Sequence, residues 1–198
     1  NYPVIGDGKT ENYTVKELII EPGANLLIKE SGRLTTTGDF VNNDTVTVER
    51  GTLEFASYST VNGSDKIKIN AGTLEYEGKN QITISDISIT SSGTIKSIAD
   101  LLHNPDAAIN INKAQYVDDG GMFPTVTTYG TVTMPVGKLN RLSVASGKLT
   151  LQDDKDSTLD VDNLDLKGLL SSLQTLTNNP IFGSVSINAA DGDGSGDG

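Results

Sequence analysis

Residues Val46–Ala56 read VTVERGTLEFA, and residues Ile67–Glu77 read IKINAGTLEYE. In both stretches, two apolar residues at alternate positions lead to a corner glycine, and two more apolar residues at alternate positions leave it. Alternation with a period of two is typical of a β-strand, because successive side chains point to opposite faces of a sheet. Each stretch therefore predicts a strand, a tight corner and a second strand.

The same pattern recurs along the chain. An apolar residue stands two positions after each of six glycines, namely Gly32, Gly51, Gly72, Gly93, Gly130 and Gly147. Successive corners lie roughly 17 to 21 residues apart, except for a longer gap after Gly93 that we interpret as two coils, one of them degenerate. A short period built from alternating strands is typical of a solenoid, in which each coil buries its apolar face against its neighbours. We predict an all-β fold, a parallel β-helix with coils of roughly 17–21 residues.

The pattern also divides the chain. Residues 1–14 show little periodicity and are predicted to be a lead-in that covers the open edge of the first coil. Residues 15–190 form the predicted β-helix domain, and residues 191–198 form an acidic, glycine-rich tail or linker. Leucines with helical spacing predict a short helix over about 168–177, which would cap the last coil; they are Leu169, Leu170, Leu173 and Leu176.

Residues 98–129 break the repeat and predict one irregular excursion from the solenoid. Asn104-Pro105 and the run Asp118 to Gly121 are turn signals. A long irregular segment on a regular scaffold is either a functional loop or a coil that repeats badly. Weak alternation over Ala108–Ile111 favours a degenerate coil for part of the range.

Composition limits the classes of function. The formal net charge is −11, which argues against a nucleic-acid partner because phosphate backbones are bound by clustered Lys and Arg. The chain has no Cys and one His, His103, which excludes Cys/His nucleophiles and sites built from several histidines. No apolar run approaches the length of a membrane-spanning helix, so we predict no membrane insertion.

Aromatic residues fall into two groups. Phe55 and Tyr76 both stand four positions after a corner glycine, on the same face as the apolar residue at position two, and are predicted to be a stacked pair in the core. The aromatic residues outside the regular positions are the predicted ligand-binding surface: Tyr58, Tyr116, Phe123 and Tyr129. Three of these four belong to the excursion.

Polar residues form rows on the outward face. A threonine follows the corner glycine at Thr52, Thr73, Thr94 and Thr131, so adjacent coils are predicted to stack these hydroxyls about 4.8 Å apart. The neighbouring outward row holds Glu54, Glu75 and Lys96, and its charges disfavour the flat, uncharged surface that ice binding needs.

Acidic residues near the end of the chain suggest calcium. Asp191, Asp193 and Ser195, followed by Gly196, match the opening of a loop that supplies oxygen ligands at its positions 1, 3 and 5 and glycine at position 6. The bidentate acid that completes such a loop is missing, and a flexible acidic linker explains the same residues. We expect no other cofactor.

A catalytic function has little support. Parallel β-helices include polysaccharide lyases and hydrolases that use paired acids, and Asp118-Asp119 resembles the adjacent aspartates of pectin-degrading hydrolases. The His and Arg-Lys motifs that accompany those aspartates are missing, so a turn is the simpler interpretation. We predict that the protein is not an enzyme, with a polysaccharide lyase or hydrolase as an alternative.

The coil pattern, the Asn42-Asn43-Asp44 turn and the threonine-rich outward rows resemble extracellular bacterial β-helix surface adhesins. Within that group, the layout is similar to the cellulose-binding tāpirins. The resemblance implies a secreted or cell-surface domain that attaches without catalysis to an insoluble polysaccharide such as cellulose. An alternative is a structural subunit of an extracellular filament or surface layer, which would self-associate through its exposed end strands.

Overall fold

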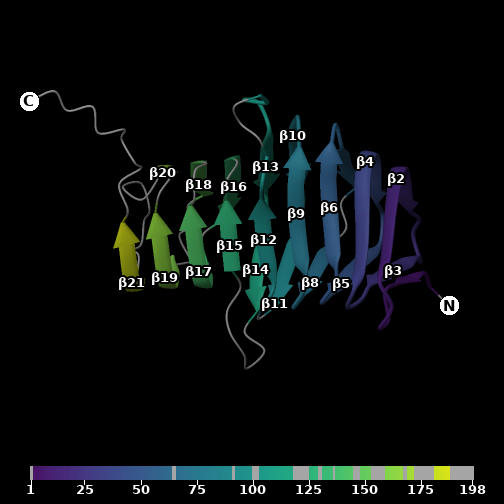
Figure 1. The fold of residues 1–198 in the computed structure, drawn as a ribbon, viewed down its shortest axis with the longest axis horizontal. Coiled ribbons are helices and arrows are strands. Elements are labelled where there is room, and N and C mark those ends of the chain that lie inside the picture. The colour runs from purple at the N-terminus through teal and green to yellow at the C-terminus, as the bar shows by residue number, and fades with distance from the viewer. Residues whose placement is uncertain are drawn as a thin grey trace, which may run out of the picture.

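The computed structural model of the chain describes residues 2–63, 66–90, 92–99, 103–117, 125–128, 131–135, 137–144, 148–152, 159–166, 169–171 and 181–187. Within these ranges the strands stack into three parallel sheets around one core, which is the architecture of a β-solenoid. Figure 1 shows the strands side by side, with β2 and β21 at opposite ends of the stack. The predicted all-β parallel solenoid is confirmed.

The three sheets differ in length. The longest, here called the long sheet, has ten strands: β2 (Glu11–Ile20), β4 (Gly32–Asn42), β6 (Thr52–Ser57), β9 (Thr73–Gly78), β12 (Thr94–Ser97), β15 (Thr125–Thr128), β17 (Lys138–Val144), β19 (Asp160–Leu166), β21 (Ile181–Ile187) and β7 (Thr60–Gly63), which pairs with β4. The six-stranded sheet contains β1 (Val4–Ile5), β3 (Asn25–Ile28), β5 (Thr45–Glu49), β8 (Ile67–Asn70), β11 (Ile87–Thr90) and β14 (Ala114–Val117). The five-stranded sheet contains β10 (Gln81–Ile84), β13 (Ala108–Ile111), β16 (Thr131–Pro135), β18 (Lys148–Gln152) and β20 (Leu169–Ser171).

Residues from successive coils stand in register. Thr52 pairs with Thr73, and Thr73 pairs with Thr94, so a regular coil takes about 21 residues. The inward row of the long sheet is apolar in every described coil after the first, because alternation brings the same residue type back to the same face. Its buried members are Leu34, Leu53, Leu74, Ile95, Val126, Leu142 and Leu164. Burial of each such side chain contributes about 1.5–3 kcal/mol.

Large aromatic residues fill the core beside this row. Phe55 and Tyr76 are partners in neighbouring coils and both are completely buried, which confirms the predicted core pair. The ring of Phe55 also meets that of Phe40 edge to face, with 5.2 Å between ring centroids. Such pairs stabilise a core by about 0.5–1.5 kcal/mol beyond the area that they bury.

The corners between the six-stranded sheet and the long sheet use two residues with different roles. The residue before the corner glycine has a left-handed backbone, at Ser31, Arg50, Ala71 and Ser92. The glycine itself is needed for space. A Cβ atom at Gly72 would lie 2.5 Å from the Val48 carbonyl oxygen in the neighbouring coil, and a Cβ atom at Gly51 would lie 2.5 Å from the Lys29 carbonyl oxygen. Glycine therefore lets consecutive coils approach closely, while its neighbour makes the turn.

The described parts of the predicted excursion over 98–129 agree with the degenerate-coil interpretation. β13, β14 and β15 pair in register with β10, β11 and β12, and Thr125 is the next partner of Thr94 along the long sheet. The two turn signals fall between these strands in the sequence. The described strands of this coil therefore match those of the preceding coil, although more residues separate them in the sequence.

Two other expectations about the repeat need correction. Thr131 begins β16 in the five-stranded sheet, and the residue beside Thr94 in the long sheet is Thr125. Similarly, Val132 and Leu149 belong to the row of Ile109. Both predictions are wrong because glycines precede strands at two different corners of the coil, and the same local sequence pattern follows both.

Both ends of the predicted domain also differ from expectation. The lead-in contributes strands of its own, since β1 pairs with β3 and β2 begins at Glu11, so residues 4–5 and 11–14 belong to the first coil. At the other end, the predicted helix over 168–177 is wrong at Leu169–Ser171, which form β20 and pair with β18. Pairing with a formed strand outweighs the helical spacing of the leucines there, and residues 172–177 lie outside the described ranges. No described segment forms a helix that could span a membrane.

Candidate functional site

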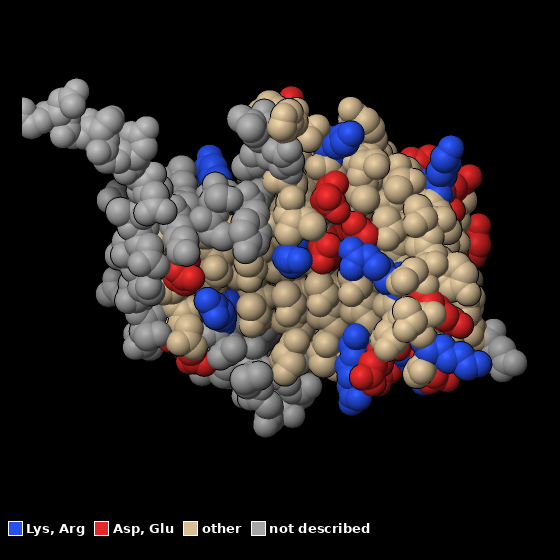
Figure 2. All heavy atoms as spheres, in the orientation of Figure 1, with Lys and Arg blue, Asp and Glu red and all other residues tan. Residues whose placement is uncertain are grey.

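The outer face of the long sheet carries a cluster of charged side chains from four adjacent strands. We call it the charge cluster, and its members are Arg33 on β4, Glu54 on β6, Glu75 and Glu77 on β9, and Lys96 on β12. Figure 2 shows acidic and basic side chains gathered over this part of the sheet. The sequence positions explain the grouping, because Glu54, Glu75 and Lys96 are successive partners in register.

Arg33 joins two of the acids. Its Nη2 atom lies 2.9 Å from Oε2 of Glu54 and 3.0 Å from Oε1 of Glu75, and its Nε donates to Glu54 at 3.0 Å. Lys96 Nζ lies 3.5 Å from Oε2 of Glu75. The Thr35 hydroxyl donates to Glu54 at 2.6 Å. These contacts satisfy two carboxylates that are buried even though they stand on the outer face. Buried charges need such partners.

Glu77 is the exposed member of the cluster. One oxygen of each carboxylate of Glu54, Glu75 and Glu77 lies within 4.8 Å of the others. Partial loss of solvent raises the pKa of Glu77, and the negative charge of Glu54 raises it further. Since three acids face two bases, the cluster keeps one negative charge in excess when all groups are ionised. A metal ion on these carboxylate oxygens would compete with Arg33 for Glu54 and Glu75.

Threonines extend the outer face beyond the cluster. Thr52, Thr73, Thr94 and Thr125 are successive partners, followed by Arg141. Strands in a sheet are about 4.8 Å apart, so the hydroxyls form a ladder with that repeat. The predicted ladder is confirmed for its first three members.

Tyr58 directly follows β6 and is the most exposed aromatic residue of the described ranges, with 66% of its surface accessible. The Nζ atom of Lys79, which follows β9, lies 5.9 Å from the centroid of the ring. A cation at this distance from an exposed ring is attracted by about 0.5–1 kcal/mol and helps to hold it in place. Tyr58 therefore presents an exposed aromatic ring at the ends of the two central strands of the charge cluster.

Tyr116 has a different setting. It is the partner of Ile89, in an inward row of the six-stranded sheet, and it packs against the core. Its hydroxyl donates to the Pro135 carbonyl at 2.9 Å, and its ring lies directly against the backbone of Gly137. Burial raises the pKa of Tyr116. These contacts give the residue a structural role, and its predicted ligand binding remains a prediction.

The other residues of the sequence-based site cannot be placed beside Tyr58 or Tyr116. Phe123 and Tyr129 lie outside the described residues, as do Asp191, Asp193 and Ser195 of the predicted calcium loop. Their roles in ligand or calcium binding stay predictions.

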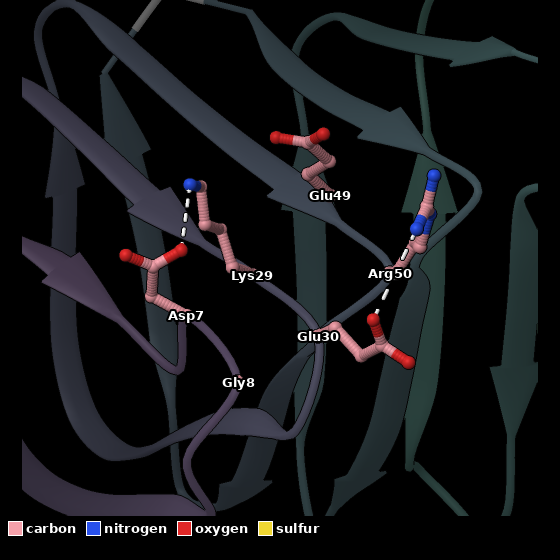
Figure 3. A pocket seen from close by; sticks show the side chains of 6 residues that line it. All are labelled: Asp7, Gly8, Lys29, Glu30, Glu49 and Arg50. Carbon is pink, nitrogen blue, oxygen red and sulfur yellow. Dashed lines mark hydrogen bonds and ion pairs between the residues drawn. The ribbon is translucent and has the colours of Figure 1, made fainter.

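A small hollow lies at the corner between β3 and β4, near the N-terminal end. Figure 3 shows Lys29 directed at Asp7 and Arg50 directed at Glu30. Lys29 Nζ lies 2.8 Å from Asp7, and this hydrogen bond raises the pKa of Lys29. Arg50 Nη1 lies 3.9 Å from Glu30, with both side chains largely exposed. Exposed ion pairs contribute little to stability. The lining residues are Asp7, Gly8, Lys29, Glu30, Glu49 and Arg50.

Sequence reasoning placed Glu54, Glu75 and Lys96 in one outward row but missed that they form a network. Two signals could have revealed it. Acids recur at the same coil position in Glu54 and Glu75, and a base follows at that position in Lys96. Arg33 stands one row away, within reach of both acids.

Comparison of the chain with protein-family models, curated proteins and solved structures finds no match.

Proposed function

We propose that this chain is a non-catalytic, secreted or cell-surface adhesin domain that binds an insoluble polysaccharide such as cellulose. The proposed contact surface is the outer face of the long sheet around β6 and β9. The observation that carries the proposal is the exposed ring of Tyr58 at the ends of the strands that hold the charge cluster.

The chemistry of this surface suits a sugar polymer. Sugar rings present apolar C–H faces and many hydroxyls, so their sites combine an aromatic ring with a few placed polar groups. Tyr58 supplies the ring, and Glu77 supplies a carboxylate that is exposed to solvent. The threonine ladder adds hydroxyls repeated at the spacing of the coils. A repeating array on a rigid support favours a repeating ligand over a small molecule.

The contacts of the acids favour binding over catalysis. Glycoside hydrolysis needs two carboxyl groups free to transfer a proton and to attack or activate water. Glu54 and Glu75 are engaged by Arg33, and Glu54 also accepts the Thr35 hydroxyl. Those groups would have to leave before either carboxylate could act. We therefore expect no release of reducing ends from cellulose or xylan, and release by the purified protein would favour the hydrolase alternative.

The test is a pull-down on insoluble cellulose, xylan and chitin. We expect the wild-type protein to be retained on at least one of them and Tyr58→Ala to lose about tenfold in affinity, as for removal of a stacking contact. Tyr2→Ala is the matched control, measured in dilute solution so that association of copies does not contribute, because Tyr2 is also an exposed tyrosine, with 56% of its surface accessible, and lies at the N-terminal end.

A double variant, Phe123→Ala with Tyr129→Ala, separates this surface from the one suggested by the sequence. If the polysaccharide retains the double variant but not Tyr58→Ala, the result supports the long-sheet surface. The opposite result would move the site to residues 118–130. If the wild-type protein is retained on none of the polysaccharides, the proposed function is wrong.

A further inference from the structure

The N-terminal end of the solenoid exposes apolar residues that later coils bury. Tyr13 on β2 is the partner of Leu34 on β4, in the inward row of the long sheet. Tyr13 has 51% of its surface exposed, whereas Leu34 has 2%. The difference arises because Leu34 has a coil on each side and Tyr13 has one. Large exposed hydrophobic residues of the described ranges gather at this end, with Tyr58 as the exception: Tyr2, Val4, Tyr13 and Ile19.

The edge of β2 is suited to pairing. Among the described strands, β2 pairs only with β4, so one edge of this ten-residue strand has free backbone groups. Such an edge is a template for another strand. The register of β2 with β4 shifts between Val15 and Glu17, where β4 carries one extra residue, so the second half of β2 follows a local bend. The first half, Glu11–Val15, has no such interruption.

The opposite end of the same sheet offers a matching strand. β21 pairs in parallel with β19, and among the described strands it has no other partner. The row that begins with Tyr13 ends at Val185, since partners connect Tyr13, Leu34, Leu53, Leu74, Ile95, Val126, Leu142, Leu164 and Val185. All strands of the sheet run in one direction. The outer edge of β21 therefore has the orientation that the outer edge of β2 requires.

We propose that β21 of one copy pairs in parallel with β2 of a second copy, so that the chain assembles head to tail. Continuation of the register places Ser184 beside Asn12, Val185 beside Tyr13, Ser186 beside Thr14 and Ile187 beside Val15. Apolar positions then meet apolar positions, and polar positions meet polar positions, which is the condition for a stable register. β21 contains no charged residue, and this register sets Glu11 opposite Gly183. Pairing brings no like charges together on these strands.

The symmetry of this contact predicts its product. Two different surfaces meet, so the contact is heterologous and does not close at a dimer. The mass of the assembly should rise continuously with concentration from the monomer value of 20.9 kDa. The net charge of −11 opposes association, and salt screens this repulsion. Association should therefore strengthen with ionic strength.

The first test is sedimentation equilibrium of the full chain from dilute to concentrated solution, at low and high salt. We expect Tyr13→Lys to weaken association about tenfold or more, because it places a charge where the next coil packs. Tyr58→Lys is the matched control, since it makes the same change at an exposed tyrosine away from the ends, and it should associate like the wild-type protein. A wild-type protein that stays monomeric under every condition overturns the proposal, as does Tyr13→Lys that assembles normally.

A second test measures the register between β21 and β2 of neighbouring copies, and it does not depend on whether Tyr13→Lys folds. The chain has no cysteine, so single-cysteine variants at two polar positions, Asn12→Cys and Ser184→Cys, give an unambiguous signal. When the two proteins are mixed and oxidised, the proposed contact joins position 12 of one copy to position 184 of the other. We expect the mixed disulfide to exceed either homodimer several-fold. Random pairing of equal amounts gives a mixed disulfide at twice the level of each homodimer, so a ratio of two or less would exclude the head-to-tail register.

Discussion

Adding one methyl group at a corner glycine and removing one from the residue before it should have opposite effects on stability. Gly72 is buried between β8 and β9, and a Cβ atom there would lie 2.5 Å from the Val48 carbonyl oxygen and 2.7 Å from its Cγ1. The carbonyl belongs to the backbone of the neighbouring coil and cannot rotate away. We therefore expect Gly72→Ala to force the coils apart.

The size of the effect follows from the two interactions that the separation disturbs. Overpacking a well-packed site costs about 1–3 kcal/mol. The same separation weakens the hydrogen bond from Thr73 N to the Gly51 carbonyl, now 2.9 Å long, which contributes about 1 kcal/mol. Gly72→Ala should therefore lower the free energy of unfolding by about 3 kcal/mol.

Ala71 already has a left-handed backbone, with a φ of 51°. Glycine there relieves about 1–2 kcal/mol of strain and restores about 0.5–1 kcal/mol of chain entropy to the unfolded state, so Ala71→Gly should be neutral or slightly stabilising.

Urea denaturation followed by far-ultraviolet circular dichroism measures both variants, with midpoints compared at a common slope. Gly72→Asn distinguishes crowding from backbone conformation. Asparagine tolerates a left-handed backbone, so Gly72→Asn would lower stability only slightly if Gly72 were needed for its φ angle. Crowding makes Asn at least as damaging as Ala. A loss of less than about 1 kcal/mol in Gly72→Ala, or a smaller loss in Gly72→Asn than in Gly72→Ala, would show that Gly72 is not crowded.

Three further outcomes test the core and the charge cluster. The pKa of Glu77 is raised in the folded state, so the free energy of unfolding should fall as the pH rises from the unfolded pKa of 4.5 through the raised pKa. Glu77→Gln should therefore be more stable than the wild-type protein at pH 7, by less than about 1 kcal/mol, and equally stable near pH 4. Urea titrations at both pH values measure the difference. Arg33→Gln leaves two buried acids without their shared partner and should lower the free energy of unfolding by about 2 kcal/mol after allowance for the exposure of Arg33. Adding Glu54→Gln should restore part of this loss. If the losses of the two single variants simply add in the double variant, the two residues do not form a network. Phe40→Ala removes a completely buried ring and should cost about 3–5 kcal/mol by thermal or urea unfolding, whereas a cost below about 1 kcal/mol would mean that the site collapses around the cavity.

The repeated alternation of apolar and polar residues was enough to predict the sheets, because each coil packs the same face against the same core. An apolar residue two positions after Gly32, Gly51, Gly72 and Gly93 faces the core in every case. Corner chemistry was harder to predict. A glycine suggests a positive φ, yet the left-handed residue is its neighbour, because the crowded position cannot carry a side chain at all.

Other errors arise from contacts between distant parts of the chain. The leucines after Gly168 have helical spacing, but β20 pairs with β18, and local spacing carries no information about that partner. The candidate site shows the same limit. Glu54 and Glu75 could be placed in one row from the sequence, whereas their burial under Arg33 depends on side chains from three coils.

The two proposals concern different surfaces and reinforce each other. The proposed binding surface faces outward from the long sheet, while the proposed contact between copies lies at the two ends of the stack. Head-to-tail assembly would leave Tyr58 and Glu77 exposed and repeat them along one axis. Linked sites bind a polymer with higher avidity than one site, because the second contact becomes intramolecular. Tyr13→Lys should therefore reduce retention on the polysaccharide at concentrations where the wild-type protein assembles, and should have no effect in dilute solution. A loss that is equal at all concentrations would instead place Tyr13 in the binding surface itself.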